Sequence, residues 1–108
     1  MNCRGRLAPT PTGFLHVGHA YTFGIAAKRA ADELVLRVDD LDSTRCTDAY
    51  IAAAIDDLHW LGIAWAEGPD CGGESGPYFQ SQRTASYLQA WQELAAKKII
   101  YPSPHSRR

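Results

Sequence analysis

The sequence lacks the features that define several large classes of protein. Its three cysteines, Cys3, Cys46 and Cys71, are odd in number and show no Cys-x-x-Cys spacing, which argues against a disulfide framework and a zinc knuckle. No apolar run approaches the roughly 20 residues of a membrane-spanning helix, and the opening residues lead into no signal peptide. These absences predict a protein of the cytoplasm, a reducing compartment, with no membrane partner.

An excess of charge of one sign is also missing. Eleven Lys and Arg residues against twelve Asp and Glu residues give a formal net charge of −1, so the chain as a whole attracts polyanions weakly. Any binding of nucleic acid must therefore come from local sites. With 108 residues, of which 45% are hydrophobic and 21% charged, the chain suits one domain with its own core.

An alternation of strand and helix patterns is present instead. We expect one strand over residues 3–8, before a Pro-Thr-Pro-Thr-Gly loop, and another over residues 34–38. The continuous apolarity of the second is typical of a parallel strand covered on both faces. Between them, apolar residues at three- and four-residue spacing from Leu15 to about residue 31 predict a buried, close-packing helix. This order predicts a right-handed βαβ unit and an α/β fold.

A second helix is predicted after the polar loop at residues 39–43. Thr47 with Asp48 can begin this helix, and Gly62 can end it just beyond Leu61. Its apolar residues recur at helical spacing, which predicts a buried stripe. The stripe consists of Ile51, Ala54, Ile55 and Leu58.

A third helix is predicted after an irregular insertion at residues 64–82, which are rich in Gly, Pro and polar groups. Thr84 can cap this helix, and residues 99–101 begin a further strand. The apolar face of the helix consists of Tyr87, Leu88, Trp91, Leu94 and Ala95. For the large aromatic residues we favour core packing over a base-stacking platform. These residues are Tyr50, Trp60, Trp65, Tyr87 and Trp91.

The strongest chemical signal is His16-Val17-Gly18-His19, which follows a strand and a glycine-containing loop at the start of a helix. Unpaired amide groups and the positive end of the helix dipole favour a phosphate there. Imidazoles three residues apart lie on one helical face and can donate hydrogen bonds to a triphosphate, while Gly18 lets a flat ring approach the backbone. Alone, the motif fits nucleotide binding and simple capping equally well, and a metal ion less well, because no third ligand is obvious.

Two other polar residues have a weaker signal. Arg45, which follows the acidic loop, can reach a phosphate or balance the charge of Asp42, and the sequence does not separate these alternatives. His59 lies in the last turn of the predicted second helix, where a residue of the helix surface or boundary is the simplest interpretation.

Three blocks, in order along the chain, resemble signatures of the glutamate-specific class I aminoacyl-tRNA synthetases. The block from Arg6 to His19 is similar to Arg-Phe-Ala-Pro-Ser-Pro-Thr-Gly-x-Leu-His-x-Gly in that family. Residues 36–42 are similar to Leu-Arg-Ile-Glu-Asp-(Thr/Leu)-Asp, and a third block covers residues 57–69 and 80–83. The resemblance implies the amino-terminal half of a Rossmann-like, HIGH-containing catalytic domain with a parallel sheet.

The resemblance implies that residues 1–108 are part of a domain that uses ATP, with Mg²⁺ carried by the nucleotide, to activate L-glutamate for transfer to tRNA. The ATP-binding residues would be Thr12, Gly13, His16, Gly18 and His19, with both histidines catalytic. The glutamate-binding residues would be Arg6, Ala8, Thr10 and Asp39. Arg6 would pair with the side-chain carboxylate through two parallel hydrogen bonds. Asp39, one methylene shorter than the family Glu, would bind the α-ammonium.

Within this family the resemblance is greatest to the glutamyl-Q tRNA(Asp) synthetases, which attach glutamate to queuosine in an anticodon, because of Leu41 and the glycine-rich insertion. The alternative is part of a glutamyl-tRNA synthetase that charges tRNA(Glu). In many members of the glutamyl-Q group, Tyr-Pro is followed by Cys-x-Cys, which supplies the first half of a zinc site. In this chain, Tyr-Pro is followed by Ser103-Pro104-His105. No structural zinc is therefore expected, and Arg107 and Arg108 are predicted to form a solvated basic terminus.

The second phosphate-binding signature of class I synthetases, a Lys-Met-Ser-Lys-Ser-like loop, does not occur in the chain. The second half of the sheet is also missing, so we expect an open sheet edge, an uncovered apolar face and possible self-association. Weak activity or none is expected for the chain alone. A non-catalytic nucleotide- or partner-binding remnant stays open, as does a pantoate-activating ligase, although residues 6–13 and 39–42 argue against the latter.

Overall fold

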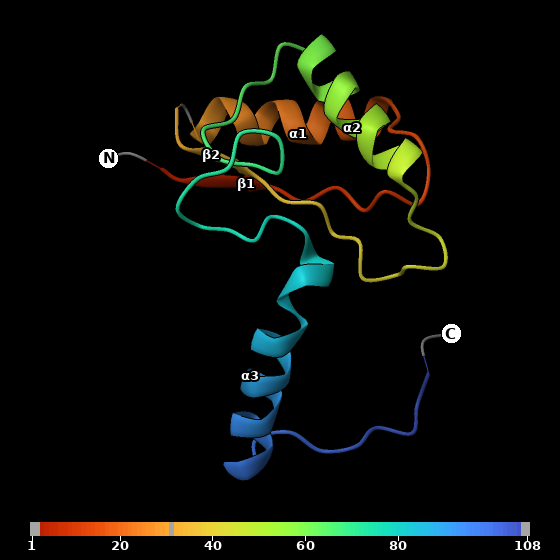
Figure 1. Ribbon diagram of the computed structural model, residues 1–108, viewed down its shortest axis with the longest axis vertical. Helices are drawn as coiled ribbons and strands as arrows, with labels where there is room; N and C mark the ends of the chain where they lie inside the picture. The colour runs from red at the N-terminus through yellow and green to blue at the C-terminus, as the bar shows by residue number, and fades with distance from the viewer. Residues whose placement is uncertain (1–2, 31, 107–108) are drawn as a thin grey trace.

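The computed structural model describes residues 3–30 and 32–106 and shows a short sheet, two helices packed on it and a third helix that extends away (Figure 1). The elements in chain order are β1 (Gly5–Leu7), α1 (Val17–Ala30), β2 (Leu34–Leu36), α2 (Asp48–Trp60), the 3₁₀ helix η1 (Gln80–Arg83) and α3 (Thr84–Ala96). No helix of the described residues has the length and apolarity needed to cross a membrane. The predicted basic terminus, Arg107 and Arg108, and the predicted end of the first helix at residue 31 lie outside the described residues.

The two strands pair in parallel, from Gly5 opposite Leu34 to Leu7 opposite Leu36. Because α1 joins them, the predicted strand–helix–strand unit with a parallel pair is confirmed. Both strands are shorter than predicted, although Val38 extends the pairing of the second strand as an isolated bridge. The α/β fold class is therefore correct.

The far edge of β2 is also paired, which corrects the prediction that residues 64–82 are wholly irregular. Glu67 forms a parallel bridge with Val35, and Phe79 forms a parallel bridge with Val38. Residues 68–77 thus form a loop between the two halves of a third, interrupted strand. Each half pairs over so few residues that no alternating apolar pattern marks it in the sequence. Among the described strands, β1 is left with an open edge.

The core lies between the sheet and the helices α1 and α2. Leucines of β1, β2 and α2 form its centre, and Leu36 and Leu58 are 0% exposed. Because successive strand residues point to opposite faces, Leu34 and Leu36 face the helices while Val35 and Arg37 lie on the other face. The prediction that the second strand is covered by packed elements on both faces is therefore wrong. Helices cover one face, and the loop at residues 68–77 partly covers the other.

The boundaries of α2 follow the sequence signals closely. The Thr47 hydroxyl accepts a hydrogen bond from the Tyr50 amide at 3.2 Å, which satisfies one of the unpaired donors of the first turn. Gly62 has φ +75°, a conformation that ends the helix and favours glycine. Of the predicted stripe, Ala54 and Leu58 are buried, and the two isoleucines are half-buried.

Helix α3 starts differently from the prediction. Arg83 takes the N-cap position without a side-chain cap, and the Thr84 hydroxyl instead donates to the Ser81 carbonyl at 3.2 Å. The 3₁₀ helix before it is held by Asp40, whose carboxylate accepts hydrogen bonds from the Ser81 amide and hydroxyl, both at 2.8 Å. The predicted cap at Thr84 is wrong because a carboxylate 41 residues away orders the turn that leads into the helix.

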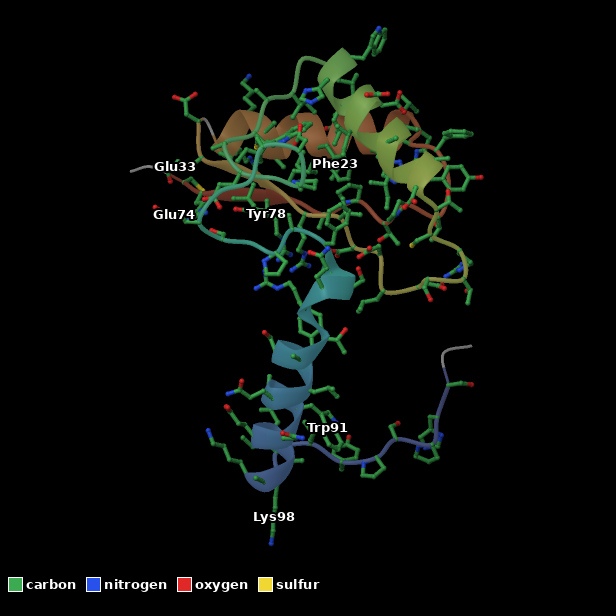
Figure 2. All side chains as sticks on the ribbon, viewed as in Figure 1. Phe23, Glu33, Glu74, Tyr78, Trp91 and Lys98 are labelled. Carbon is green, nitrogen blue, oxygen red and sulfur yellow. The ribbon has the colours of Figure 1, made fainter. Side chains whose placement is uncertain are left out.

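The predictions of burial for α3 and for several aromatic residues are wrong. None of the residues of α3 is buried, and Trp91 lies far from the body of the fold (Figure 2). Trp60 is 84% and Trp91 59% exposed, and Tyr87 is also at the surface, whereas Tyr50 and Trp65 are half-buried. The first helix is also less buried than predicted, since Ala30 is its one buried residue among those described. Residues 99–101 form no strand.

Glu67, in the first half of the third strand, contacts the end of the loop at residues 68–77, the residue that follows the loop, and Arg4 just before β1. Its carboxylate accepts hydrogen bonds from the Tyr78 hydroxyl at 2.6 Å and the Ser75 amide at 2.9 Å, and it forms an ion pair with Arg4. These interactions, with the Tyr78 hydrogen bond as the largest, hold the pKa of Glu67 below its usual value. The loop is thus fastened by an ionised acid.

We expect this acid to make the stability of the chain depend on pH. Since its pKa in the folded state lies below the reference value of 4.5, the unfolded state binds the proton more readily as the pH falls. The contribution of Glu67 is complete above that value and is lost as the pH drops through the folded pKa. Glu67→Gln should therefore lower the free energy of unfolding at neutral pH and have a smaller effect at about pH 3.5.

Urea unfolding of both proteins at the two pH values measures this difference. Glu74→Gln is the matched control, because Glu74 is an exposed acid of the same loop. A deficit of Glu67→Gln that stays constant with pH would contradict the assignment of the ionised network.

Candidate active site

The site lies at the carboxyl ends of the two strands, where ligands bind in open α/β sheets. The loop at residues 8–16 leaves β1 and leads into α1, and the loop at residues 39–43 leaves β2 on the same side (Figure 1). A hydrogen bond from the Asp39 amide to the Pro9 carbonyl, at 3.0 Å, joins the two loops. The parallel pairing thus brings together the first two blocks that the sequence singled out.

The two histidines cap the start of α1 with one nitrogen each. The His16 amide donates to Nδ1 of His19 at 3.0 Å, and the Gly18 amide donates to Nδ1 of His16 at 3.1 Å. A nitrogen that accepts a hydrogen bond carries no proton, so each neutral ring must carry its proton on Nε2. Among the described residues, neither Nε2 has a partner. Each ring therefore keeps one N–H donor available to a ligand.

The two rings lie close together at the start of the helix. The ring centroids lie 4.0 Å apart. Partial burial, and then the neighbouring His16, lower the pKa of His19, which favours the neutral ring at neutral pH. The pair thus offers two N–H donors beside the positive end of a helix.

Gly18 lets a flat ring approach the backbone, as the sequence predicted. A Cβ at this position would lie 2.9 Å from Cε1 and 3.0 Å from Nδ1 of His16. The flat ring that approaches the backbone here is the imidazole of His16.

The loop before the histidines exposes its threonines. The Thr12 amide donates to the Thr10 carbonyl at 2.9 Å, which makes a tight turn. Both side chains are exposed, and a Cβ on Gly13 would meet nothing within 4 Å. The loop therefore has open space beside it, and the roles predicted for Thr10, Thr12 and Gly13 stay predictions.

Arginines gather on the face of the sheet that the helices leave open. Arg4, Arg6 and Arg37 contribute to the lining of a cavity of about 300 Å³, together with Tyr78. Arg4 pairs with Glu67, and Arg37 pairs with a carboxylate of its own. The structure gives Arg6 no partner among the described residues. Its guanidinium is therefore the one of the three that is available to an anion.

Asp39 and Asp40 of the second block both have partners in the structure. Arg37 donates to Asp39 from Nε at 2.7 Å and from Nη2 at 3.2 Å, and the hydrogen bond to Asp39 raises the pKa of Arg37. Asp40 holds Ser81 as described above. Asp39 remains at the carboxyl edge beside Pro9, where its predicted role requires it.

Comparison with known proteins decides the family. Residues 2–105 match the profile of the tRNA synthetases class I (E and Q), catalytic domain. The chain belongs to this family. The resemblance found in the three sequence blocks is thereby confirmed for nearly the whole chain.

Several relatives carry names of the same synthetase family. The chain is 43% identical over 108 residues to a glutamyl-Q tRNA(Asp) synthetase of Nitratidesulfovibrio vulgaris, covering 97% of this chain and 33% of that protein. It is 48% identical over 97 residues to a glutamate–tRNA ligase of a Psychrobacter species, covering 87% of this chain and 19% of that one. The chain thus spans at most about a third of the length of these two relatives.

The fold agrees with that of solved synthetases. The chain superposes on the glutamate-tRNA synthetase of Elizabethkingia anophelis with a TM-score of 0.76 at 31% identity, covering 89% of this chain and 20% of that structure. The predicted Rossmann-like, amino-terminal half of a synthetase fold is confirmed.

Other polar groups of this synthetase domain were only partly predicted. Arg45 donates to Asp42 from Nε at 2.6 Å, so the structure supports charge balance for Arg45. His59 stacks on Trp65 with ring centroids 4.3 Å apart, and its Nε2 lies 3.3 Å from a carboxylate oxygen of Asp70. No sequence signal predicted this contact, because it joins the end of α2 to the loop between the two halves of the third strand.

Metal ligands do not gather in the described part of this synthetase domain. Within residues 3–30 and 32–106, no three His, Cys, Asp or Glu side chains lie close enough together to hold an ion. The acids of the second block are already engaged by Arg37, Ser81 and Arg45. These residues do not fit a protein-held Mg²⁺, and the expectation of no structural zinc stays a prediction.

Proposed function

We propose that this chain is the part of a glutamate-activating aminoacyl-tRNA synthetase that receives ATP and L-glutamate. The observation that carries the proposal is the pair of imidazoles at the start of α1, each with Nδ1 engaged and with no partner for Nε2 among the described residues. Arg6 of β1, which has no partner in the described part of the chain, supplies a cation for the amino acid. Membership of the class I synthetase family supports both assignments.

In the proposed reaction, the α-carboxylate oxygen of glutamate attacks the α-phosphorus of ATP. A bond forms between these atoms, the bond from the α-phosphorus to the bridging oxygen breaks, and pyrophosphate leaves. The Nε2–H groups of His16 and His19 would stabilise the charge that moves onto the leaving phosphates, and the loops would align the reactants. Mg²⁺ would arrive with the nucleotide, keep much of its water and neutralise phosphate charge.

On the amino-acid side, Arg6 would bind the side-chain carboxylate with two parallel hydrogen bonds. Asp39 would accept hydrogen bonds from the α-ammonium, and Ala8 and Thr10 would line the path between them. The loop that carries Thr12, Gly13 and Gly18 would seat the nucleotide. The activated glutamate would then pass to a tRNA, and we propose the cytoplasm as the compartment.

The acceptor on the tRNA separates two versions of the proposal. Leu41 and the relative that covers 97% of the chain support the glutamyl-Q reaction, in which a modified anticodon base receives glutamate. The 48% identity to a glutamate–tRNA ligase supports the charging of tRNA(Glu) instead. Both versions share the activation step, so tests of that step apply to either.

We expect His16→Asn with His19→Asn to weaken ATP binding by about tenfold to a hundredfold, as the loss of hydrogen bonds to charged phosphates predicts. The asparagine oxygen can still accept the backbone hydrogen bond, so the free energy of unfolding should change by no more than about 0.5 kcal/mol. Isothermal titration calorimetry with ATP measures the first quantity, and urea unfolding the second. Undiminished affinity in a folded double variant would refute the proposed role of the rings.

Glutamate-dependent exchange of pyrophosphate into ATP distinguishes an active chain from a remnant. Exchange that requires glutamate supports activation and excludes a pantoate-activating ligase. ATP binding without exchange would support a non-catalytic remnant of the synthetase.

A further inference from the structure

Of the two ion pairs in and beside the loop at residues 39–43, Arg37–Asp39 is less exposed to solvent than Arg45–Asp42. The Arg37 guanidinium donates from Nε to Oδ1 at 2.7 Å and from Nη2 to Oδ2 at 3.2 Å. The two side chains are 19% and 21% exposed, against 72% and 36% for Arg45 and Asp42 in the next loop. Because exposed pairs contribute little and are poorly ordered, the Arg37 pair is the one that can set a carboxylate's direction.

The backbone around Asp39 is held as well. Its amide donates to the Pro9 carbonyl at 3.0 Å, across the two loops of the site. The next residue, Asp40, is anchored to Ser81 by two hydrogen bonds of 2.8 Å each. With the main chain fixed on both sides, the remaining freedom of Asp39 is the rotation of its short side chain. The Arg37 fork removes that freedom.

The pair still leaves room for a ligand. An ionised carboxylate offers about four lone-pair sites, and Arg37 uses one on each oxygen. The other sites can accept hydrogen bonds from an ammonium group. Arg37 is also neutralised by the pair, so on this face it does not compete with Arg6 for an anion. Arg6 is thus available to an anion and Arg37 orients a carboxylate, although both lie on the same face of the sheet.

We propose that Arg37 is a positioning residue that aims the Asp39 carboxylate at the α-ammonium of the amino acid and so selects amino acids over their deamino analogues. This inference rests on the proposed function, because it takes Asp39 as the group that meets the ammonium. Asp39 is one methylene shorter than the glutamate of the family. Its carboxylate therefore reaches less far, and the direction in which it points matters more.

The test compares L-glutamate with glutarate, which has both carboxylates and lacks the α-amino group. Calorimetry on the 108-residue chain should show that Arg37→Gln weakens glutamate binding about tenfold while glutarate binding changes less than about twofold, because only the ammonium contact is lost. Arg37→Lys should recover part of the preference, since a lysine keeps the charge but not the two-pronged geometry. Arg45→Gln, which removes the exposed pair nearby, should leave both affinities unchanged.

The outcomes separate this inference from the proposed function. If Arg37→Gln weakens glutamate and glutarate equally, Arg37 has a structural role and the inference fails. If Asp39→Asn removes the preference while Arg37→Gln keeps it, the role of Asp39 stands and only the inference fails. A wild-type chain that binds neither acid, or an Asp39→Asn chain with an intact preference, contradicts both.

Discussion

Replacing Arg6 with alanine should lower the affinity for L-glutamate by about a hundredfold to a thousandfold and remove the preference over L-glutamine. Among the described residues, the guanidinium of Arg6 is the one of three on its cavity that has no acidic partner. A site that loses a charge-assisted, two-pronged hydrogen bond loses discrimination as well as affinity. Calorimetric titration with the two amino acids measures both quantities.

Two further variants define what Arg6 contributes. Arg6→Lys keeps the charge without the parallel donors, so its affinity for glutamate should lie between those of wild type and Arg6→Ala. Arg29→Ala removes an exposed arginine in the last turn of α1 and serves as the control for lost charge. Should Arg6→Ala bind glutamate as wild type does, the assignment of this residue to the substrate carboxylate is wrong.

Replacing Leu58 with alanine should lower the free energy of unfolding by about 3–5 kcal/mol. Leu58 is 0% exposed and lies in the cluster that joins α2 to both strands, with Leu7, Leu34 and Leu36. The whole stability of a small domain is roughly 5–15 kcal/mol, so this one change can unfold much of the population. Urea unfolding followed by circular dichroism measures the loss.

Leu88→Ala is the matched control for the core variant. It removes the same atoms from a residue of α3 that is 55% exposed, and we expect a change within about 0.5 kcal/mol. A loss as large as that of Leu58→Ala would show that the apolar face of α3 is buried in solution against another molecule. Sedimentation would then test the self-association expected from the sequence.

The architecture explains why such an association was expected. The edge of β1 has no strand beside it in the described chain, and Tyr87, Leu88, Trp91 and Leu94 are exposed on α3. The solved synthetase that shares this fold is covered over only 20% of its length. The predicted open edge is thus confirmed at β1, whereas the exposed stripe of α3, which was predicted to be buried, has no surface to pack on among the described residues.

The features that the sequence determined by itself are those encoded within a few neighbouring residues. Thr47 and Gly62 set the ends of α2 through local backbone conformation, and α1 begins where the histidine motif follows its glycine-containing loop. The family signatures are likewise short strings. Each of these signals acts over one turn of helix or one loop, so it can be read without knowledge of the fold.

Only the tertiary structure decided the partners and the burial of the other groups. Asp40 holds Ser81, 41 residues away, and Arg4 pairs with Glu67, 63 residues away. The apolar stripe of α3 looks the same in the sequence as a buried one, yet it is exposed because nothing in the described chain covers it. Such properties depend on which surfaces the parallel pairing of β1 and β2 brings together, and local patterns do not contain that information.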